Sequence, residues 1–71
     1  MPIVTIKIVE GRTKEQKHKL LETVTDAVVD SLDAAPETVR VVIEEMANDH
    51  FGIGGLPVLQ YRLKKAKENK K

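Results

Sequence analysis

The chain has 71 residues and a net charge of +1, with 41% apolar and 32% charged residues. This length allows one domain and excludes multidomain enzymes and any fold that needs a large monomeric core. Cysteine is absent, so no disulfide or thiolate-bound metal can supplement a small core. An oligomer is therefore expected rather than a monomer.

The charge is divided unevenly along the chain. Residues 1–61 carry six cations against ten carboxylates, a net charge of −4, whereas residues 62–71 carry six cations against one carboxylate, a net charge of +5. We therefore expect one domain over residues 1–61 and a basic tail over residues 62–71 that is disordered or forms a frayed helix. Such a tail is a candidate for nucleic-acid binding. It contains no known binding motif, so a solvated tail that aids solubility is the preferred interpretation.

Hydropathy gives no sign of a membrane protein. No segment has the composition of a signal peptide or the roughly 20 apolar residues of a membrane span. A cysteine-free chain is compatible with a reducing compartment, and we expect a cytoplasmic protein.

The first two expected elements are a strand and a helix. Over residues 3–9, β-branched apolar residues alternate with polar ones, which is typical of a half-buried strand. A helix is predicted over residues 14–32, because Thr13 and Gln16 have the spacing of a capping box. Apolar residues then recur at three- and four-residue steps and mark one helix face. These residues are Leu20, Leu21, Val24, Ala27, Val28 and Leu32.

A second strand and a hairpin follow. Pro36 excludes further helix and leaves residues 33–38 as a connection. Alternation predicts a strand over residues 39–45, and the glycines within residues 51–56 predict a small hairpin. Residues 58–63 fit either a strand or a helix.

Strand, helix and strand in this order form a βαβ unit, whose strands are parallel and joined by a right-handed crossover. The helix covers one face of the two-stranded sheet, yet Ile3 and Val42 make the other face apolar as well. Parallel sheets are normally buried on both faces. The expected fold is an α/β domain, a single βαβ unit with a small C-terminal hairpin, assembled as an oligomer that covers the open face.

Few side chains suggest a catalytic or metal site. His18 and His50 lie far apart and lack partners at metal-ligand spacing, so we expect no metal site. A nucleophile–histidine set is excluded in practice, because cysteine is absent and Ser31 is the one serine.

Pro2 is the unusual residue. Removal of Met1 would leave a chain that begins with a secondary amine on a rigid ring. Desolvation and neighbouring cations both lower the pKa of an amine, which could make Pro2 a neutral base at physiological pH.

Several short motifs occur in order over about residues 2–55. They are Met1-Pro2-Ile3, Ile8-Val9-Glu10-Gly11-Arg12-Thr13, Leu32-Asp33-Ala34, Val39-Arg40-Val41, Glu45-Met46-Ala47 and His50-Phe51-Gly52-Ile53-Gly54-Gly55. Together they resemble the 4-oxalocrotonate tautomerase family. The resemblance is specific, because it joins an amino-terminal proline, two arginines and a glycine-flanked phenylalanine.

The resemblance implies a cofactor-independent isomerase that moves a proton in a small unsaturated 2-hydroxy or 2-keto acid such as 2-hydroxymuconate. Pro2 would be the general base, and Arg12 would bind one substrate carboxylate. Arg40 from a neighbouring subunit would bind the other end of the substrate and stabilise charge on the carbonyl oxygen. Phe51 would form an apolar wall that keeps the site dry. Bidentate guanidinium groups suit planar carboxylates, which gives these roles independent chemical sense.

The resemblance also implies partners and a setting. The family forms hexamers, so the implied assembly is a homohexamer built as a trimer of dimers. The implied ligand is a small dicarboxylate or keto acid from aromatic-compound degradation, with no metal or organic cofactor, no membrane and no nucleic acid.

Two other functions stay open. Related dehalogenases add water by means of an extra acidic residue and an extra arginine, but the corresponding positions here are Ile53 and Val9. Both are apolar, which favours proton transfer. A decarboxylase or hydratase of the same superfamily is one alternative, and a non-enzymatic oligomer with a nucleic-acid-binding basic tail is another.

Overall fold

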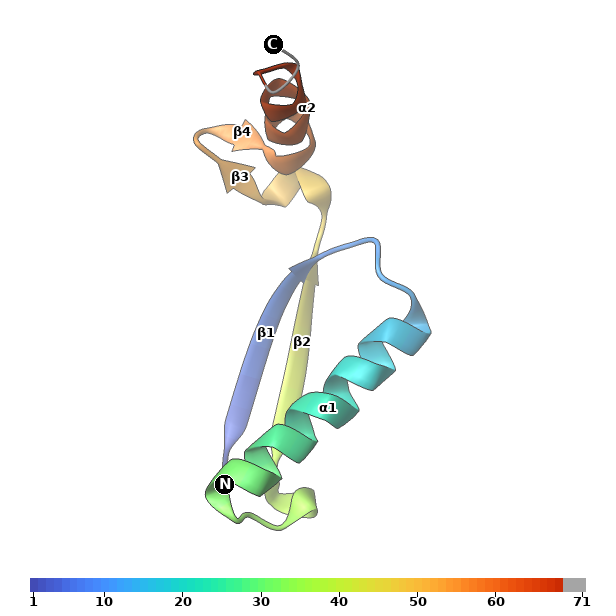
Figure 1. Ribbon diagram of the computed structural model, residues 1–71, viewed down its shortest axis with the longest axis vertical. Helices are drawn as coiled ribbons and strands as arrows, with labels where there is room; N and C mark the ends of the chain where they lie inside the picture. The colour runs from blue at the N-terminus through green and yellow to red at the C-terminus, as the bar shows by residue number, and fades with distance from the viewer. Residues whose placement is uncertain (69–71) are drawn as a thin grey trace.

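The computed structural model describes residues 1–68, and residues 69–71 of the predicted tail lie outside the described residues. In chain order the elements are β1 (Ile3–Val9), α1 (Lys14–Leu32), the 3₁₀ turn η1 (Pro36–Thr38), β2 (Arg40–Met46), the 3₁₀ turn η2 (Asn48–His50), β3 (Gly52–Ile53), β4 (Leu56–Pro57) and α2 (Val58–Glu68). Figure 1 shows β1, β2 and α1 together, with the hairpin and α2 beyond the carboxyl ends of the two strands.

β1 and β2 form a parallel pair, in register from Ile3 opposite Arg40 to Val9 opposite Met46. α1 runs obliquely across one face of this pair (Figure 1). The predicted βαβ unit is therefore confirmed. The second strand begins and ends one residue later than predicted. The Val39 N–H donates to the Pro36 carbonyl and closes η1, while the Glu10 N–H donates to the Met46 carbonyl and extends the ladder.

The N-terminus of α1 has the predicted capping box. The Thr13 hydroxyl accepts from the Gln16 N–H at 3.1 Å, and the Gln16 side chain accepts from the Thr13 N–H at 2.9 Å. Of the predicted apolar face, Leu20, Leu21, Val24 and Val28 are half-buried in the single chain, whereas Ala27 and Leu32 are exposed. Lys17, on the same helix, is half-buried.

The C-terminal hairpin is as short as predicted. β3 and β4 pair antiparallel, with Gly52 opposite Pro57, so Pro57 lies within β4 rather than after it. Gly54 and Gly55 have φ of 58° and 88°, conformations that glycine adopts without a Cβ penalty. These two residues make the tight turn between the strands.

α2 settles the ambiguity of residues 58–63 in favour of a helix. Its first residue, Val58, is 1% exposed, and the Val58 N–H donates to the Phe51 carbonyl at 2.8 Å. The helix runs without a break across the boundary predicted after Tyr61 and reaches Glu68. Residues 62–68 take the helical one of the two predicted forms and make up the basic stretch of α2, with Arg62, Lys64, Lys65 and Lys67.

A single chain buries little of its apolar surface. Among the described residues, the buried apolar side chains are Val39 and Val58. The accessible surface is 5751 Å², against about 4,400 Å² for a compact monomer of this mass. The radius of gyration is 16.5 Å, against about 11 Å for a compact chain of this length.

The open face of the sheet contains apolar side chains, as predicted. Ile3 is 66% exposed and Val42 is 45% exposed. Lys7 and Glu44 on the same face form an ion pair at 4.0 Å. Within residues 1–68, neither helix is long and apolar enough to cross a membrane.

Candidate active site

Pro2 and Arg40 lie together at the amino ends of the two strands. The Arg40 N–H donates to the Pro2 carbonyl at 2.9 Å, one step before the first registered pair of the ladder. Pro2 is half-buried, whereas Met1 before it is 79% exposed. An amide nitrogen is not basic, so Pro2 can act as a base only if Met1 is absent.

The Arg40 side chain is exposed and partly held by its own segment. One guanidinium nitrogen donates to the Glu37 carbonyl in η1. A guanidinium has five N–H donors in a rigid fork, so most of them stay available to an anion. Arg40 therefore offers a fixed positive charge at the Pro2 end of the strands.

Arg12 lies at the opposite end, in the connection from β1 to α1. Gly11 has a φ of 127° and turns the chain out of the strand. Arg12 is exposed and borders a cleft of about 190 Å³, with Ile8, Gln16, Lys17 and Leu20 as its other lining residues. Within residues 1–68 its guanidinium makes no ion pair or hydrogen bond, which leaves its fork free for a carboxylate.

Lys17, the second cation that lines this cleft, is paired with Glu45. The Lys17 ammonium lies 3.2 Å from the Glu45 carboxylate and also contacts its other oxygen at 3.3 Å. Glu45 and Glu44 point to opposite faces of β2, as expected for adjacent strand residues, and therefore do not form an acid–base pair.

Phe51 follows η2, beyond the carboxyl end of β2. Phe51 is 40% exposed. Its backbone is held at both ends, because the Phe51 N–H donates to the Asn48 carbonyl at 3.3 Å and the Phe51 carbonyl accepts from Val58. The ring is therefore an apolar surface on a fixed backbone.

The four predicted site residues form two groups at opposite ends of the strand pair. β1 has seven residues, and at about 3.3 Å per residue the strand separates its ends by about 20 Å. Pro2 and Arg40 lie at one end, and Arg12 and Phe51 lie beyond the other. Within one chain, Pro2 therefore lies far from Arg12 and Phe51.

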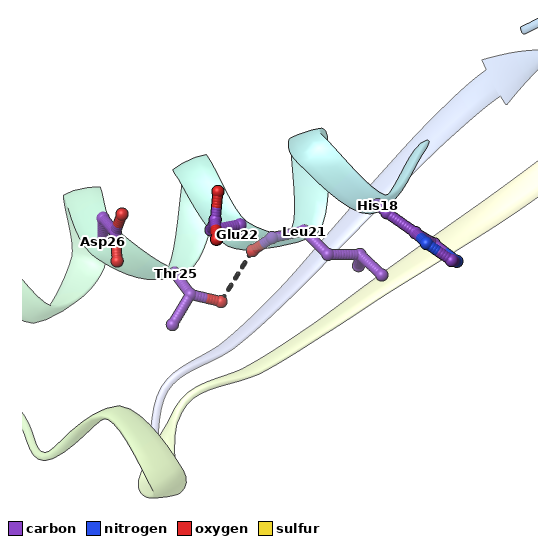
Figure 2. Close-up of a pocket in the computed structure, with 5 residues that line it drawn as sticks. All are labelled: His18, Leu21, Glu22, Thr25 and Asp26. Carbon is purple, nitrogen blue, oxygen red and sulfur yellow. Dashed lines mark hydrogen bonds between the residues drawn. The ribbon is translucent and has the colours of Figure 1, made fainter. Parts of the chain in front are cut away.

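A second depression lies on the flank of α1 and has no part in these two groups. It measures about 370 Å³ and is lined by His18, Leu21, Glu22, Thr25 and Asp26 (Figure 2). The Thr25 hydroxyl donates to the Leu21 carbonyl at 2.7 Å, so it is a bonded helix hydroxyl rather than a free nucleophile. His18 is exposed, as expected. In the part of the chain that the structure describes, no group of three or more His, Cys, Asp or Glu residues could hold a metal ion.

One contact near the site was not foreseen from the sequence. The Glu10 carboxylate accepts from the backbone N–H of Asn48 at 3.1 Å and from the Asn48 side-chain amide at 3.3 Å. These residues are 38 positions apart, and no local pattern signals their contact.

Comparisons with known proteins agree with the fold and the motifs. The family model described as tautomerase enzyme matches residues 2–60. A 2-hydroxymuconate tautomerase of Pseudomonas sp. strain CF600 is 53% identical over 62 residues, which are 87% of this chain and 98% of that protein.

Solved structures show the same fold. A chain from the 4-oxalocrotonate tautomerase isozymes of Methylibium petroleiphilum superposes with a TM-score of 0.82 and 36% identity, over 89% of this chain and 98% of that one. A chain of the heterohexamer 4-oxalocrotonate tautomerase of Chloroflexus aurantiacus J-10-fl superposes with a TM-score of 0.81 and 30% identity, over 84% of this chain and 97% of that one.

Proposed function

The chain belongs to the family of tautomerase enzymes and is an isomerase, and from this premise we propose that Pro2 is its general base. The proposed substrate is a small unsaturated 2-hydroxy acid, with 2-hydroxymuconate as the first candidate. This is the substrate in the name of the Pseudomonas relative.

The neighbourhood of Pro2 is the observation that supports this proposal most. The residue is half-buried at the start of β1, and the backbone N–H of Arg40 donates to the Pro2 carbonyl across the ladder. A cation near an amine disfavours the protonated form, as does partial removal from water. Once Met1 is removed, the neutral prolyl amine takes a proton from the enol hydroxyl or an activated carbon and returns it at another carbon.

The two arginines act on the substrate's charges. Arg12, whose guanidinium fork is free among the described residues, binds one carboxylate through paired N–H donors. Arg40 binds the other end and stabilises the negative charge that develops on the carbonyl oxygen as the proton moves. The resemblance implies that this Arg40 comes from a neighbouring subunit, so it is distinct from the Arg40 that pairs with Pro2 within one chain. Phe51 supplies an apolar wall that keeps water from the reacting atoms.

A complete site requires more than one copy of the chain, because the two groups of residues lie about 20 Å apart on a strand pair. We propose that one copy supplies Pro2 and another supplies Arg12 and Phe51, within a homohexamer arranged as a trimer of dimers. The scant core and the exposed Ile3 and Val42 support assembly. The Chloroflexus relative is a heterohexamer. Native mass spectrometry of this protein therefore has to determine separately whether its hexamer contains one kind of chain or two.

The test is a steady-state assay of 2-hydroxymuconate ketonisation by absorbance, with intact mass used to verify Met1 removal. Pro2→Ala replaces the rigid secondary amine with a flexible primary amine and should lower kcat by about 100-fold, the lower end of the usual contribution of a positioned base. Glu15→Ala is a matched surface control and should leave kcat unchanged. Equal activity of wild type and Pro2→Ala would remove Pro2 from the mechanism.

A further inference from the structure

Glu10 joins two segments that are distant in sequence. Its backbone N–H donates to the Met46 carbonyl at 2.8 Å and extends the pairing of β1 with β2. Its carboxylate takes two hydrogen bonds from Asn48, at 3.1 Å from the backbone N–H and 3.3 Å from the side chain. Both bonds end on the same oxygen.

The carboxylate caps η2 from outside that turn. The residue at the N-cap of η2, Ala47, has no side chain that could accept a hydrogen bond. The N–H groups of a first helical turn lack intrahelical partners and favour a nearby anion. Glu10 therefore supplies the acceptor that the local sequence lacks.

The capped turn leads directly to Phe51. The Asn48 carbonyl accepts from the Phe51 N–H, and the Phe51 carbonyl accepts from Val58 at the start of α2. A chain of hydrogen bonds thus runs from the Glu10 carboxylate through η2 to the backbone of Phe51.

On its other side, Glu10 is two residues from Arg12. The intervening Gly11 has a φ of 127°, so the chain turns sharply between them. The hydrogen bonds of Glu10 hold the residue before this turn on both its backbone and its side chain. The two proposed substrate-binding residues at this end, Arg12 and Phe51, are therefore attached to one anchored residue.

We propose that Glu10 is a positioning residue that fixes Arg12 and Phe51 relative to each other. This inference rests on the proposed function for its kinetic consequence. Glu10 touches no reacting atom and acts by holding the two substrate-binding groups in one geometry. Small misplacements of positioned groups can cost up to about 100-fold in rate.

The experiment compares Glu10→Ala, which removes the acceptor, with Glu10→Gln, which keeps an acceptor oxygen, and with Glu15→Ala as a surface control. Glu10→Ala should raise KM for 2-hydroxymuconate about 10-fold or more, with a smaller change in kcat, because Arg12 and Phe51 bind while Pro2 reacts. Glu10→Gln should recover most of the loss, and Glu15→Ala should match wild type.

Hydrogen exchange gives a readout that does not depend on the reaction. Glu10→Ala should speed exchange at the Asn48 and Phe51 amides, with no change at the amides of β1. If wild type fails to isomerise 2-hydroxymuconate while this exchange pattern appears, the proposed function is wrong, but the positioning role of Glu10 is supported.

Three results would overturn the proposal. They are unchanged KM and exchange in Glu10→Ala, a loss in Glu10→Gln as large as in Glu10→Ala, or a loss of activity that follows the unfolded fraction with KM unchanged. If Glu10→Ala does not fold, Asn48→Ala replaces it, because this change deletes one of the two bonds and should give a smaller rise in KM.

Discussion

Co-expression of a Pro2→Ala chain with an Arg12→Ala chain should give a higher kcat/KM than either variant has alone. The reason is the separation of the two residues within one copy. They lie at opposite ends of a seven-residue strand, about 20 Å apart along its axis. This distance is far longer than an arginine side chain, so the proposed site can combine the two residues only across a subunit boundary.

The size of the recovery follows from the assembly. If each site takes Pro2 from one copy and Arg12 from another, random mixing of equal amounts gives about one quarter of the sites both intact residues. Alone, Pro2→Ala should retain about 1% of wild-type turnover or less. Loss of the charge-assisted hydrogen bonds of Arg12 should lower kcat/KM by about 10- to 150-fold. The recovered quarter therefore exceeds the activity of either variant.

The assay is ketonisation of 2-hydroxymuconate by purified mixed oligomers, with subunit mixing verified by native mass spectrometry. Pro2→Ala chains mixed with the double variant Pro2→Ala/Arg12→Ala serve as the control, which contains no Pro2 and should show no recovery. If verified mixed oligomers are no more active than the variants alone, Pro2 and Arg12 of the same copy serve the same site, and the division argued from the strand pair is wrong.

Three further predictions follow from the described contacts. Thr13→Ala should lower the free energy of unfolding by about 1 kcal/mol through loss of the α1 cap, seen in urea unfolding at fixed protein concentration; an unchanged midpoint would contradict it. Arg12→Ala should mainly raise KM, whereas Arg40→Ala should also lower kcat. Steady-state kinetics measure both constants, and identical changes in the two variants would contradict the separate roles proposed for the two arginines. Replacing the lysines of the basic stretch of α2 with glutamine should leave kcat and KM unchanged, and a fall in turnover would place this stretch in the site.

Local patterns predicted much of the fold. The alternation over residues 3–9 predicted the observed bounds of β1, and the spacing of Thr13 and Gln16 predicted the start of α1. β2 is shifted by one residue because its ends are set by hydrogen bonds to other segments.

The helix α2 shows where periodicity stops being informative. Leu59, Tyr61 and Leu63 alternate like a strand, while Leu59 and Leu63 also have helical spacing. The outcome depends on Val58, which is buried and bonded to Phe51, a contact that no local pattern contains.

The candidate site residues come from sequence motifs, but their arrangement does not. Pro2, Arg12, Arg40 and Phe51 come from the resemblance of short motifs, and their roles remain proposals. Their division between two ends of a strand pair follows only from the parallel register. The bonds between Glu10 and Asn48 required the fold to be known, because the fold brings together residues that are 38 positions apart.

The most direct test of the central claim compares the same chain with and without Met1. The Met1-retaining protein is prepared, its intact mass is measured, and it is assayed before and after treatment with methionine aminopeptidase. We expect ketonisation of 2-hydroxymuconate to appear as the mass falls by one methionine residue, because only then does Pro2 carry a basic nitrogen. Full activity of the Met1-retaining chain would contradict this expectation.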